Sequence, residues 1–205
     1  LPRDSTHLDP SMARGLRALC LLGACALAAG DVMVTGATGR TGSLIYKALK
    51  KSGALGQTKA LVRSVESARE RLGCSTCDAS EGIFVGDLTN PDSLGPAFDG
   101  VTALAIATGV SGTEDEKVIK AVELQGVKNQ VTAFLKGGVA GKRVAMISAM
   151  GTDRPSLNTI EFYKLNAEAF LASAGVPFTI VKPCGLADSA GDDVEVMVGH
   201  DAEAW

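Results

Sequence analysis

Three glycines, Gly36, Gly39 and Gly42, have the spacing that binds a dinucleotide. A short apolar segment, residues 31–35, leads directly into the first of them, and an apolar helical pattern begins at Leu44. In such a strand–turn–helix the first glycine allows the tight turn, the second lets the backbone approach a pyrophosphate, and the third lets the helix pack closely. The helix then offers unpaired N–H groups and its positive dipole end to the phosphates. The sequence therefore predicts a dinucleotide site, favoured over a glycine-rich turn without a ligand. The turn's other candidate binding residues are Thr38, Arg40 and Thr41.

Arg63 favours NADP over NAD. A second predicted strand, residues 58–63, ends at this arginine, 21 residues after Gly42. An NAD site places an acidic residue near this position, on the ribose 2′-hydroxyl. A guanidinium can instead bind a 2′-phosphate bidentately, which a carboxylate would repel. Ser64 follows, and Arg40 can add a second positive charge at the same corner. The alternative is that Arg63 is only a solvated loop arginine.

The chain alternates apolar strands with helical segments. The predicted strands are residues 31–35, 58–63, 82–86, 101–107, 142–148 and 177–182, and the predicted helices are 40–52, 65–73, 114–136 and 158–174, with a short one near 92–98. The strands are continuous apolar runs, which is typical of parallel strands buried on both faces. Right-handed crossovers then give an α/β fold, a Rossmann-like doubly wound parallel sheet with ligands at its carboxyl edge. We expect one NAD(P)-binding domain over residues 31–205.

That carboxyl edge predicts which other residues meet the cofactor. Asp87 and Leu88 follow the third strand and are expected beside the adenine. The remaining candidates end the fourth, fifth and sixth strands: Ala107, Thr108, Gly109, Ser148, Pro183 and Gly185. Because the fourth strand ends at the topological switch point, the nicotinamide is expected between Ser148 and Gly185. For each single residue, ordinary loop chemistry is the alternative.

Two patterns in the 114–136 segment are expected to be structural. Glu114, Asp115 and Glu116 form an acidic helix start, which is favourable to the helix dipole. Gln125 and Asn129 lie one helical turn apart. We expect this pair to tie its helix to a neighbouring loop rather than to contact substrate.

Composition argues against several classes of protein. The net charge of −3, the 4% of aromatic residues and the lack of a basic stripe indicate that nucleic acid is not a partner. His7 and His200 are the only histidines, so no metal site is expected. Cys74 and Cys77 form a C-x-x-C pair, but a structural zinc needs four ligands. We favour two incidental loop thiols over a redox pair.

Residues 1–30 are predicted to be an N-terminal extension with an apolar helix. Residues 18–30 carry no charge and follow Arg14 and Arg17, as in a signal or transit peptide. The run is shorter than the roughly 20 residues that span a bilayer. A helix apolar nearly all round needs burial. We expect residues 11–30 to contact a protein partner or a membrane complex, with packing on the chain's own domain as the alternative.

Several short segments together match one family. They are Thr35–Gly42, Leu61–Ser64, Val85–Leu88, Gln125–Gln130, Ser148–Gly151, Tyr163–Lys164, Ala167–Glu168 and Phe178–Pro183. With them the chain resembles, over residues 31–205, the atypical short-chain dehydrogenase/reductases, the NAD(P)-binding, NmrA-like group of plants and cyanobacteria. The resemblance implies an oxidoreductase fold that binds NADP(H) and a location in the chloroplast.

Two departures from the family pattern bear on activity. The family continues with further sheet and helix beyond a point like Trp205, so the resemblance implies a missing or reduced substrate-side cap. The family's Tyr-x-x-x-Lys motif is absent, because Ala167 stands four residues after Tyr163. A literal match at Tyr46–Lys50 lies on the first predicted helix, at the wrong end of the chemistry, and is attributed to chance.

Two functions remain open. In ordinary family members the lysine lowers the pKa of the tyrosine and binds the nicotinamide ribose. Here Lys164 can reach the ribose, whereas Tyr163 points about 100° away around the helix, and Ser148 can hydrogen-bond a carbonyl. The first hypothesis is therefore an NADPH-dependent reductase of a small carbonyl, quinone or tetrapyrrole, with Ser148 and Lys164 as catalytic residues. The second is a non-catalytic NADP(H)-binding subunit or assembly factor of a photosynthetic or respiratory membrane complex.

Overall fold

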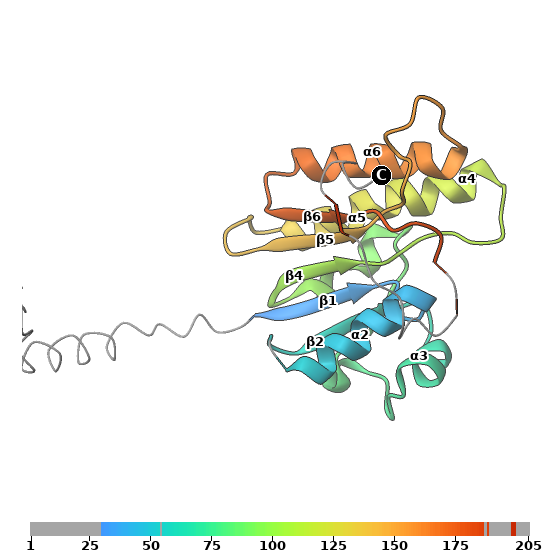
Figure 1. Ribbon diagram of the computed structural model, residues 1–205. Coiled ribbons are helices and arrows are strands. Elements are labelled where there is room, and N and C mark those ends of the chain that lie inside the picture. Colours follow the sequence, from blue (N-terminus) through green and yellow to red (C-terminus); the bar gives the residue numbers. More distant parts are fainter. Residues whose placement is uncertain (1–29, 54, 187, 189–197, 200–205) are drawn as a thin grey trace, which may run out of the picture.

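Six parallel strands form one sheet, in the order β3-β2-β1-β4-β5-β6 (Figure 1). The computed structural model describes residues 30–53, 55–186, 188 and 198–199. The strands are β1 (Asp31–Thr35), β2 (Thr58–Val62), β3 (Ile83–Val85), β4 (Val101–Ile106), β5 (Arg143–Ile147) and β6 (Phe178–Val181). The first three strands are added toward one edge of the sheet and the last three toward the other. The parallel neighbours β1 and β4 therefore mark the topological switch point. The predicted doubly wound fold is confirmed.

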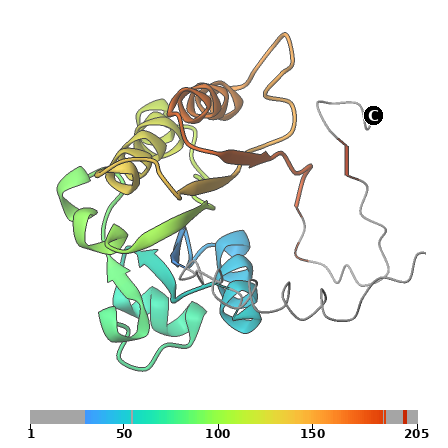
Figure 2. The same cartoon turned by 90° about the vertical axis from the view of Figure 1, so that its left-hand side faces the viewer.

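Helices cover both faces of this sheet (Figures 1 and 2). They are α2 (Arg40–Ser52), α3 (Val65–Leu72), α4 (Glu116–Ile119), α5 (Val127–Leu135) and α6 (Thr159–Ser173), with short 3₁₀ turns η1 (Ala79–Glu81), η2 (Pro91–Ser93) and η3 (Gly95–Phe98). On one face Met33 and Leu104 pack against Val131 of α5. On the other, Val34 packs against Tyr46 of α2. Both faces of the central strands are therefore buried, as their continuous apolar runs predicted.

The predicted 114–136 helix is not uniform. Between α4 and α5, the segment η4 (Lys120–Gly126) is a π-helix. Asp115 caps the helix by accepting a hydrogen bond from the Lys117 N–H, which confirms the predicted acidic start. Short π segments are frequent at functional sites, and η4 carries Glu123 into the site described below.

Cys74 and Cys77 are joined by a disulfide. The prediction of two incidental loop thiols is therefore wrong. Cys77 has a positive φ of 57°, and its N–H donates to the Glu81 carboxylate at 2.7 Å. These features fold the loop back on itself, and both sulfur-bearing side chains are buried in the core beneath α3.

The predicted N-terminal apolar helix falls outside the described residues, as does most of the chain after Leu186. Within the described part, no helix has the length and hydropathy that a bilayer crossing requires.

The Asn158→Ala variant is expected to lower the free energy of unfolding by about 1 kcal/mol. Asn158 Oδ1 accepts the Glu161 N–H at 2.9 Å, and the Glu161 carboxylate accepts the Asn158 N–H at 3.0 Å. This capping box stabilises the start of α6. Urea denaturation measures the loss, and Ser156→Ala, in the exposed loop before the cap, is the control. Equal midpoints for the two variants would show that the cap contributes nothing.

Candidate cofactor and active site

The glycine turn after β1 is closely packed at two of its three glycines. Gly36 has a φ of +69°, and a Cβ there would lie 2.5 Å from the carbonyl oxygen of Ala107. A Cβ on Gly42 would lie 2.1 Å from the carbonyl oxygen of Gly36. A Cβ on Gly39 would approach only the carbonyl oxygen of Gly36, at 3.1 Å, among the described residues. The first and third glycines thus hold α2 against the sheet, and the second leaves the approach to the turn open.

The amino end of α2 is suited to an anion. Within the described residues, no side chain caps this helix and its first turn holds no acidic residue. The N–H groups of Arg40, Thr41 and Gly42 are in the first turn, where a helix provides no backbone acceptor. A phosphate can supply that acceptor. Arg40 Nη1 lies 3.2 Å from Asp188 Oδ2 in an exposed ion pair, which is weak enough for a phosphate to compete with it.

A second charged corner follows β2 and β3. Arg63 is exposed at the end of β2, and Ser64 caps α3 by accepting the Ser67 N–H at 3.2 Å. After β3, the backbone N–H and then the hydroxyl of Thr89 donate to Asp87 and hold the pKa of its carboxyl below the usual value, with a smaller contribution from the Arg63 charge. Arg63 and Asp87 therefore face the same corner, where the carboxylate offsets part of the positive charge.

The loop after β3 is tied to α5. Asn129 Nδ2 donates to the carbonyl oxygen of Leu88 at 2.7 Å, and Gln125 Nε2 donates to Asn129 Oδ1 at 2.8 Å. The prediction that Gln125 and Asn129 fix a loop is confirmed. They hold Leu88 at the edge where the adenine was expected.

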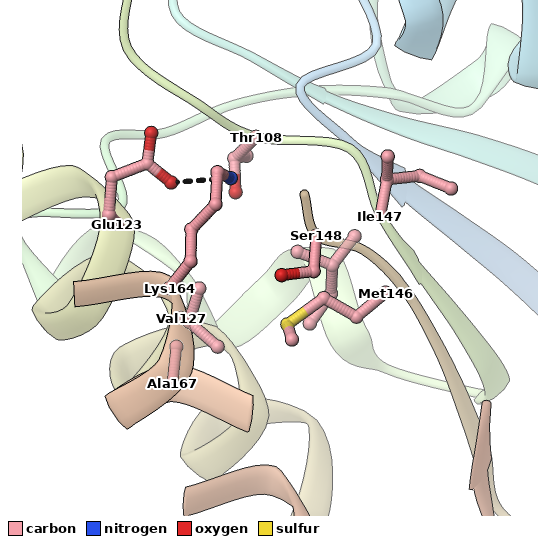
Figure 3. Close-up of a pocket in the computed structure, with 9 residues that line it drawn as sticks. Thr108, Glu123, Val127, Met146, Ile147, Ser148, Lys164 and Ala167 are labelled. Atoms are coloured by element: carbon pink, nitrogen blue, oxygen red, sulfur yellow. Dashed lines mark ion pairs between the residues drawn. The ribbon is translucent and has the colours of Figure 1, made fainter. Parts of the chain in front are cut away.

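One pocket at the carboxyl edge brings together three of the predicted residues, Thr108 after β4, Ser148 after β5 and Lys164 on α6 (Figure 3). The pocket is also lined by Ile106, Glu123, Val127, Met146, Ile147 and Ala167. The hydroxyl oxygen of Thr108 is buried and has no hydrogen-bond partner among the described residues. A buried hydroxyl without a partner costs free energy. The pocket has a volume of about 10 Å³, the room of one water molecule, so a water or a single polar atom of a ligand could supply the missing hydrogen bond.

Lys164 is paired with a carboxylate inside this pocket. Its Nζ lies 2.8 Å from Glu123 Oε2, with side-chain exposures of 14% and 2% (Figure 3). Glu123 Oε1 also accepts the Val110 N–H at 2.8 Å. A Cβ on Gly109 would be 3.4 Å from that same oxygen, so glycine leaves room for the pair. Sequence reasoning missed Glu123, since nothing in its spacing distinguishes it from a solvated helix residue.

Ser148 belongs to a second buried network, centred on Glu168. The Ser148 hydroxyl donates to Glu168 Oε1 at 2.5 Å, and the Thr152 hydroxyl donates to the same oxygen at 3.0 Å. Lys182 Nζ lies 2.9 Å from Glu168 Oε2 and donates to Thr152 Oγ1 at 2.8 Å. Glu168 and Lys182 lie within segments that carry the family resemblance, but nothing in the sequence predicted that these two side chains form an ion pair.

Tyr163 is directed elsewhere. Its hydroxyl donates to Glu116 Oε1 at 2.7 Å, and this bond, with burial and the Glu116 charge, raises the pKa of Tyr163. The predicted separation of Tyr163 from the Lys164 site is confirmed. A tyrosine held in this way is a poorer acid than a free one.

Pro183 and Gly185 line a separate, open cavity of about 300 Å³. Its other lining residues are Ala149, Met150, Arg154 and Cys184. The Met150 N–H donates to the Pro183 carbonyl oxygen at 3.0 Å, so the segments after β5 and β6 are joined. This cavity therefore begins next to Ser148 in the chain and extends the carboxyl edge beyond the first pocket.

A family model described as NAD(P)H-binding matches residues 36–204. The chain belongs to the NAD(P)H-binding family. This membership supports dinucleotide binding by the chain, the property that the glycine turn predicted.

Proteins similar in sequence to this chain include a reductase and a chloroplastic protein. Sanguinarine reductase of Eschscholzia californica is 33% identical over 83% of this chain and 74% of its own length. An uncharacterised chloroplastic protein of Arabidopsis thaliana is 32% identical over 84% of this chain and 58% of its own length. The photosystem II assembly factor Ycf39 of Cyanophora paradoxa is 27% identical, over 76% and 46%. The expected resemblance to atypical short-chain dehydrogenase/reductases is confirmed.

Solved structures agree on the fold of the NAD(P)H-binding family. A putative NAD-dependent epimerase/dehydratase from Bacillus halodurans superposes with a TM-score of 0.65 at 24% identity, covering 78% of this chain and 73% of that one. Triphenylmethane reductase of Citrobacter sp., complexed with NADP(H), gives 0.56 at 27% identity, covering 74% and 48%. The chain thus spans about half the length of that reductase.

Proposed function

We propose that the chain is an NADP(H)-dependent reductase of a small carbonyl, quinone or tetrapyrrole-type substrate. The observation that carries the proposal is that one pocket at the carboxyl edge of the sheet is lined by Thr108, Ser148 and Lys164 together. A relative named as a reductase and a solved neighbour holding NADP(H) support the reaction type and the cofactor.

Each group of residues has a proposed part in holding the cofactor. The N–H groups at the start of α2, with the turn residues Gly36, Thr38, Gly39, Arg40, Thr41 and Gly42, bind the pyrophosphate. Arg63 and Ser64 bind the 2′-phosphate, Asp87 and Leu88 border the adenine, and Ala107, Thr108, Gly109, Pro183 and Gly185 border the nicotinamide half. When bound, the nicotinamide supplies the hydride.

Ser148 and Lys164 act on the substrate and the ribose. An ammonium group has three donors, and the pair with Glu123 occupies one Lys164 N–H. Lys164 can therefore donate to a ribose hydroxyl without leaving Glu123. Ser148 follows β5 at the same pocket, where its hydroxyl can hydrogen-bond a substrate carbonyl oxygen.

Fluorescence titration with NADPH and NADH, followed by assays of NADPH oxidation, tests the proposal. The probes are 9,10-phenanthrenequinone, benzaldehyde and biliverdin, one for each substrate class. We expect NADPH to bind and at least one probe to be reduced. NADPH binding with no oxidation by any probe would contradict the reductase, and no binding would contradict the cofactor assignment.

Arg63→Ala is expected to weaken NADPH binding by about 10- to 100-fold and to leave NADH binding within about twofold, because only NADPH loses a charge-assisted contact to its 2′-phosphate. Titration of both nucleotides measures the change. The control is Arg69→Ala, which removes an exposed arginine in the last turn of α3. An equal loss of affinity for both nucleotides would show that Arg63 does not bind the 2′-phosphate.

The second candidate function is a non-catalytic NADP(H)-binding subunit or assembly factor of a plastid membrane complex. Tyr163 is held away from the pocket by Glu116, and one relative is an assembly factor. In this case residues 11–30 form the contact with the complex. Comigration of the full chain with thylakoid complexes, lost when residues 11–30 are deleted, would favour this function over the reductase.

A further inference from the structure

We propose that Lys182 supplies the proton that Ser148 gives to the substrate, passing it through Thr152 and Glu168. The proposal rests on the reductase function above. Three hydrogen bonds connect the four side chains: Lys182 Nζ donates to Thr152 Oγ1 at 2.8 Å, Thr152 Oγ1 donates to Glu168 Oε1 at 3.0 Å, and Ser148 Oγ donates to the same Oε1 at 2.5 Å.

The direction of these bonds creates the need for such a route. A serine hydroxyl has one proton, and that of Ser148 points at Glu168. Reduction of a carbonyl needs one proton on its oxygen besides the hydride. Ser148 can donate to that oxygen only if it turns away from Glu168, or if Glu168 Oε1 holds a proton that it can donate to Ser148 Oγ.

Thr152 connects Lys182 to the required oxygen. Lys182 lies directly against Oε2 of Glu168, whereas Ser148 contacts Oε1. The Thr152 hydroxyl accepts from Lys182 and donates to Oε1. A proton that passes through Thr152 therefore arrives on the oxygen that faces Ser148.

The transfer balances without any added reagent beyond the hydride of the bound nicotinamide. The Lys182 ammonium loses one proton to Thr152 Oγ1, whose own proton moves to Glu168 Oε1. That proton moves to Ser148 Oγ as the Ser148 proton goes to the substrate oxygen. The two hydroxyls and the carboxylate return to their starting forms, and Lys182 regains a proton from water.

Burial makes Lys182 the outer end of the series. Thr152 is 0% exposed, and Ser148 and Glu168 are buried at 6% and 7%. The Lys182 side chain is 36% exposed. Solvent can reprotonate Lys182 while the inner groups stay screened from it. Lys164 does not duplicate this route, because its partner Glu123 is not bonded to Ser148, Thr152 or Glu168 among the described residues.

The decisive variant is Lys182→Arg. A guanidinium keeps the positive charge beside Glu168 but does not release a proton in proteins. We expect kcat with 9,10-phenanthrenequinone to fall at least about tenfold, as for loss of a general acid, while the NADPH dissociation constant stays within about twofold. Lys117→Arg, on an exposed lysine of α4, is the matched control. Methylammonium is expected to restore part of the activity of Lys182→Ala, and guanidinium is not.

A measurement on the cofactor-free protein tests the network itself. With ¹⁵N-labelled lysine, the Lys182 ammonium should give an NMR signal that exchanges with water more slowly than that of the exposed Lys117 and that is absent in Lys182→Arg. Thr152→Val, which removes only the hydroxyl, should speed that exchange. Equal exchange in the wild type and Thr152→Val would overturn the proposal.

The outcomes separate the relay from the reductase. If the wild type reduces the quinone and Lys182→Arg does so equally well, the relay is wrong and the proposed function stands. If the wild type binds NADPH but reduces no probe, the reductase fails and the relay falls with it.

Discussion

Gly42→Ala is expected to weaken NADPH binding by about 100-fold or more and to lower the free energy of unfolding by about 2 kcal/mol. The added Cβ would lie 2.1 Å from the Gly36 oxygen, whereas an ordinary contact begins near 3.4 Å. The start of α2 must therefore move by more than 1 Å, or the turn must deform. Overpacking of this kind costs about 1–3 kcal/mol. A misplacement of about 1 Å can cost an enzyme about 100-fold in rate, and we expect a comparable loss of affinity where the displaced N–H groups hold a pyrophosphate. Nucleotide titration and urea denaturation measure the two effects.

Two controls separate packing from ligand contact. Gly39→Ala places its Cβ 3.1 Å from the Gly36 oxygen, on the open side of the turn. It should impair NADPH binding with little change in stability. Gly95→Ala meets no described atom within 4 Å and should change neither quantity. If Gly42→Ala bound NADPH normally, the turn would not be the pyrophosphate site.

Glu123→Ala is expected to lower the free energy of unfolding by about 3–5 kcal/mol, the usual cost of removing one partner from a buried ion pair. The substitution leaves Lys164 without its counter-charge and the Val110 N–H without its acceptor. Urea denaturation with an unchanged m-value would confirm that stability alone is altered.

The double variant Glu123→Gln with Lys164→Met is the test of this explanation. Glutamine keeps an oxygen for the Val110 N–H, and methionine removes the charge that lost its partner. We expect the double variant to recover most of the stability that Glu123→Gln alone loses, because neutral replacement of a whole buried pair is close to neutral. A double variant as unstable as the sum of the single ones would show that the two side chains are not coupled.

Local patterns predicted the elements and the turn. Every strand begins and ends within one residue of its predicted bounds, because continuous apolar runs between polar links identify buried parallel strands. The turn at Gly36 was predictable because its backbone conformation is available chiefly to glycine. The tie between Asn129 and Leu88 was foreseen in kind, since polar side chains one helical turn apart share a face.

The partners of the charged residues could not be predicted in the same way. Glu123 meets Lys164, and Glu168 meets Lys182, only because η4, α6 and β6 lie side by side in the folded chain. Tertiary position, not local spacing, decides such pairs. The disulfide was missed for a related reason, because it depends on the positive φ of Cys77 and on the loop contacts with Glu81.

Because η4 is π-helical, the pocket depends on the exact number of residues in this helix more than on the lengths of the surrounding loops. Deleting one residue between Lys120 and Gly126 would let the backbone return to regular α-helical turns, which would keep the flanking helices in place but shift the residues inside the segment, Glu123 among them, around the helix axis. Glu123 and Lys164 would then no longer meet. Loops in this fold can gain or lose residues during divergence, whereas a change of a single residue here would rebuild the pocket wall.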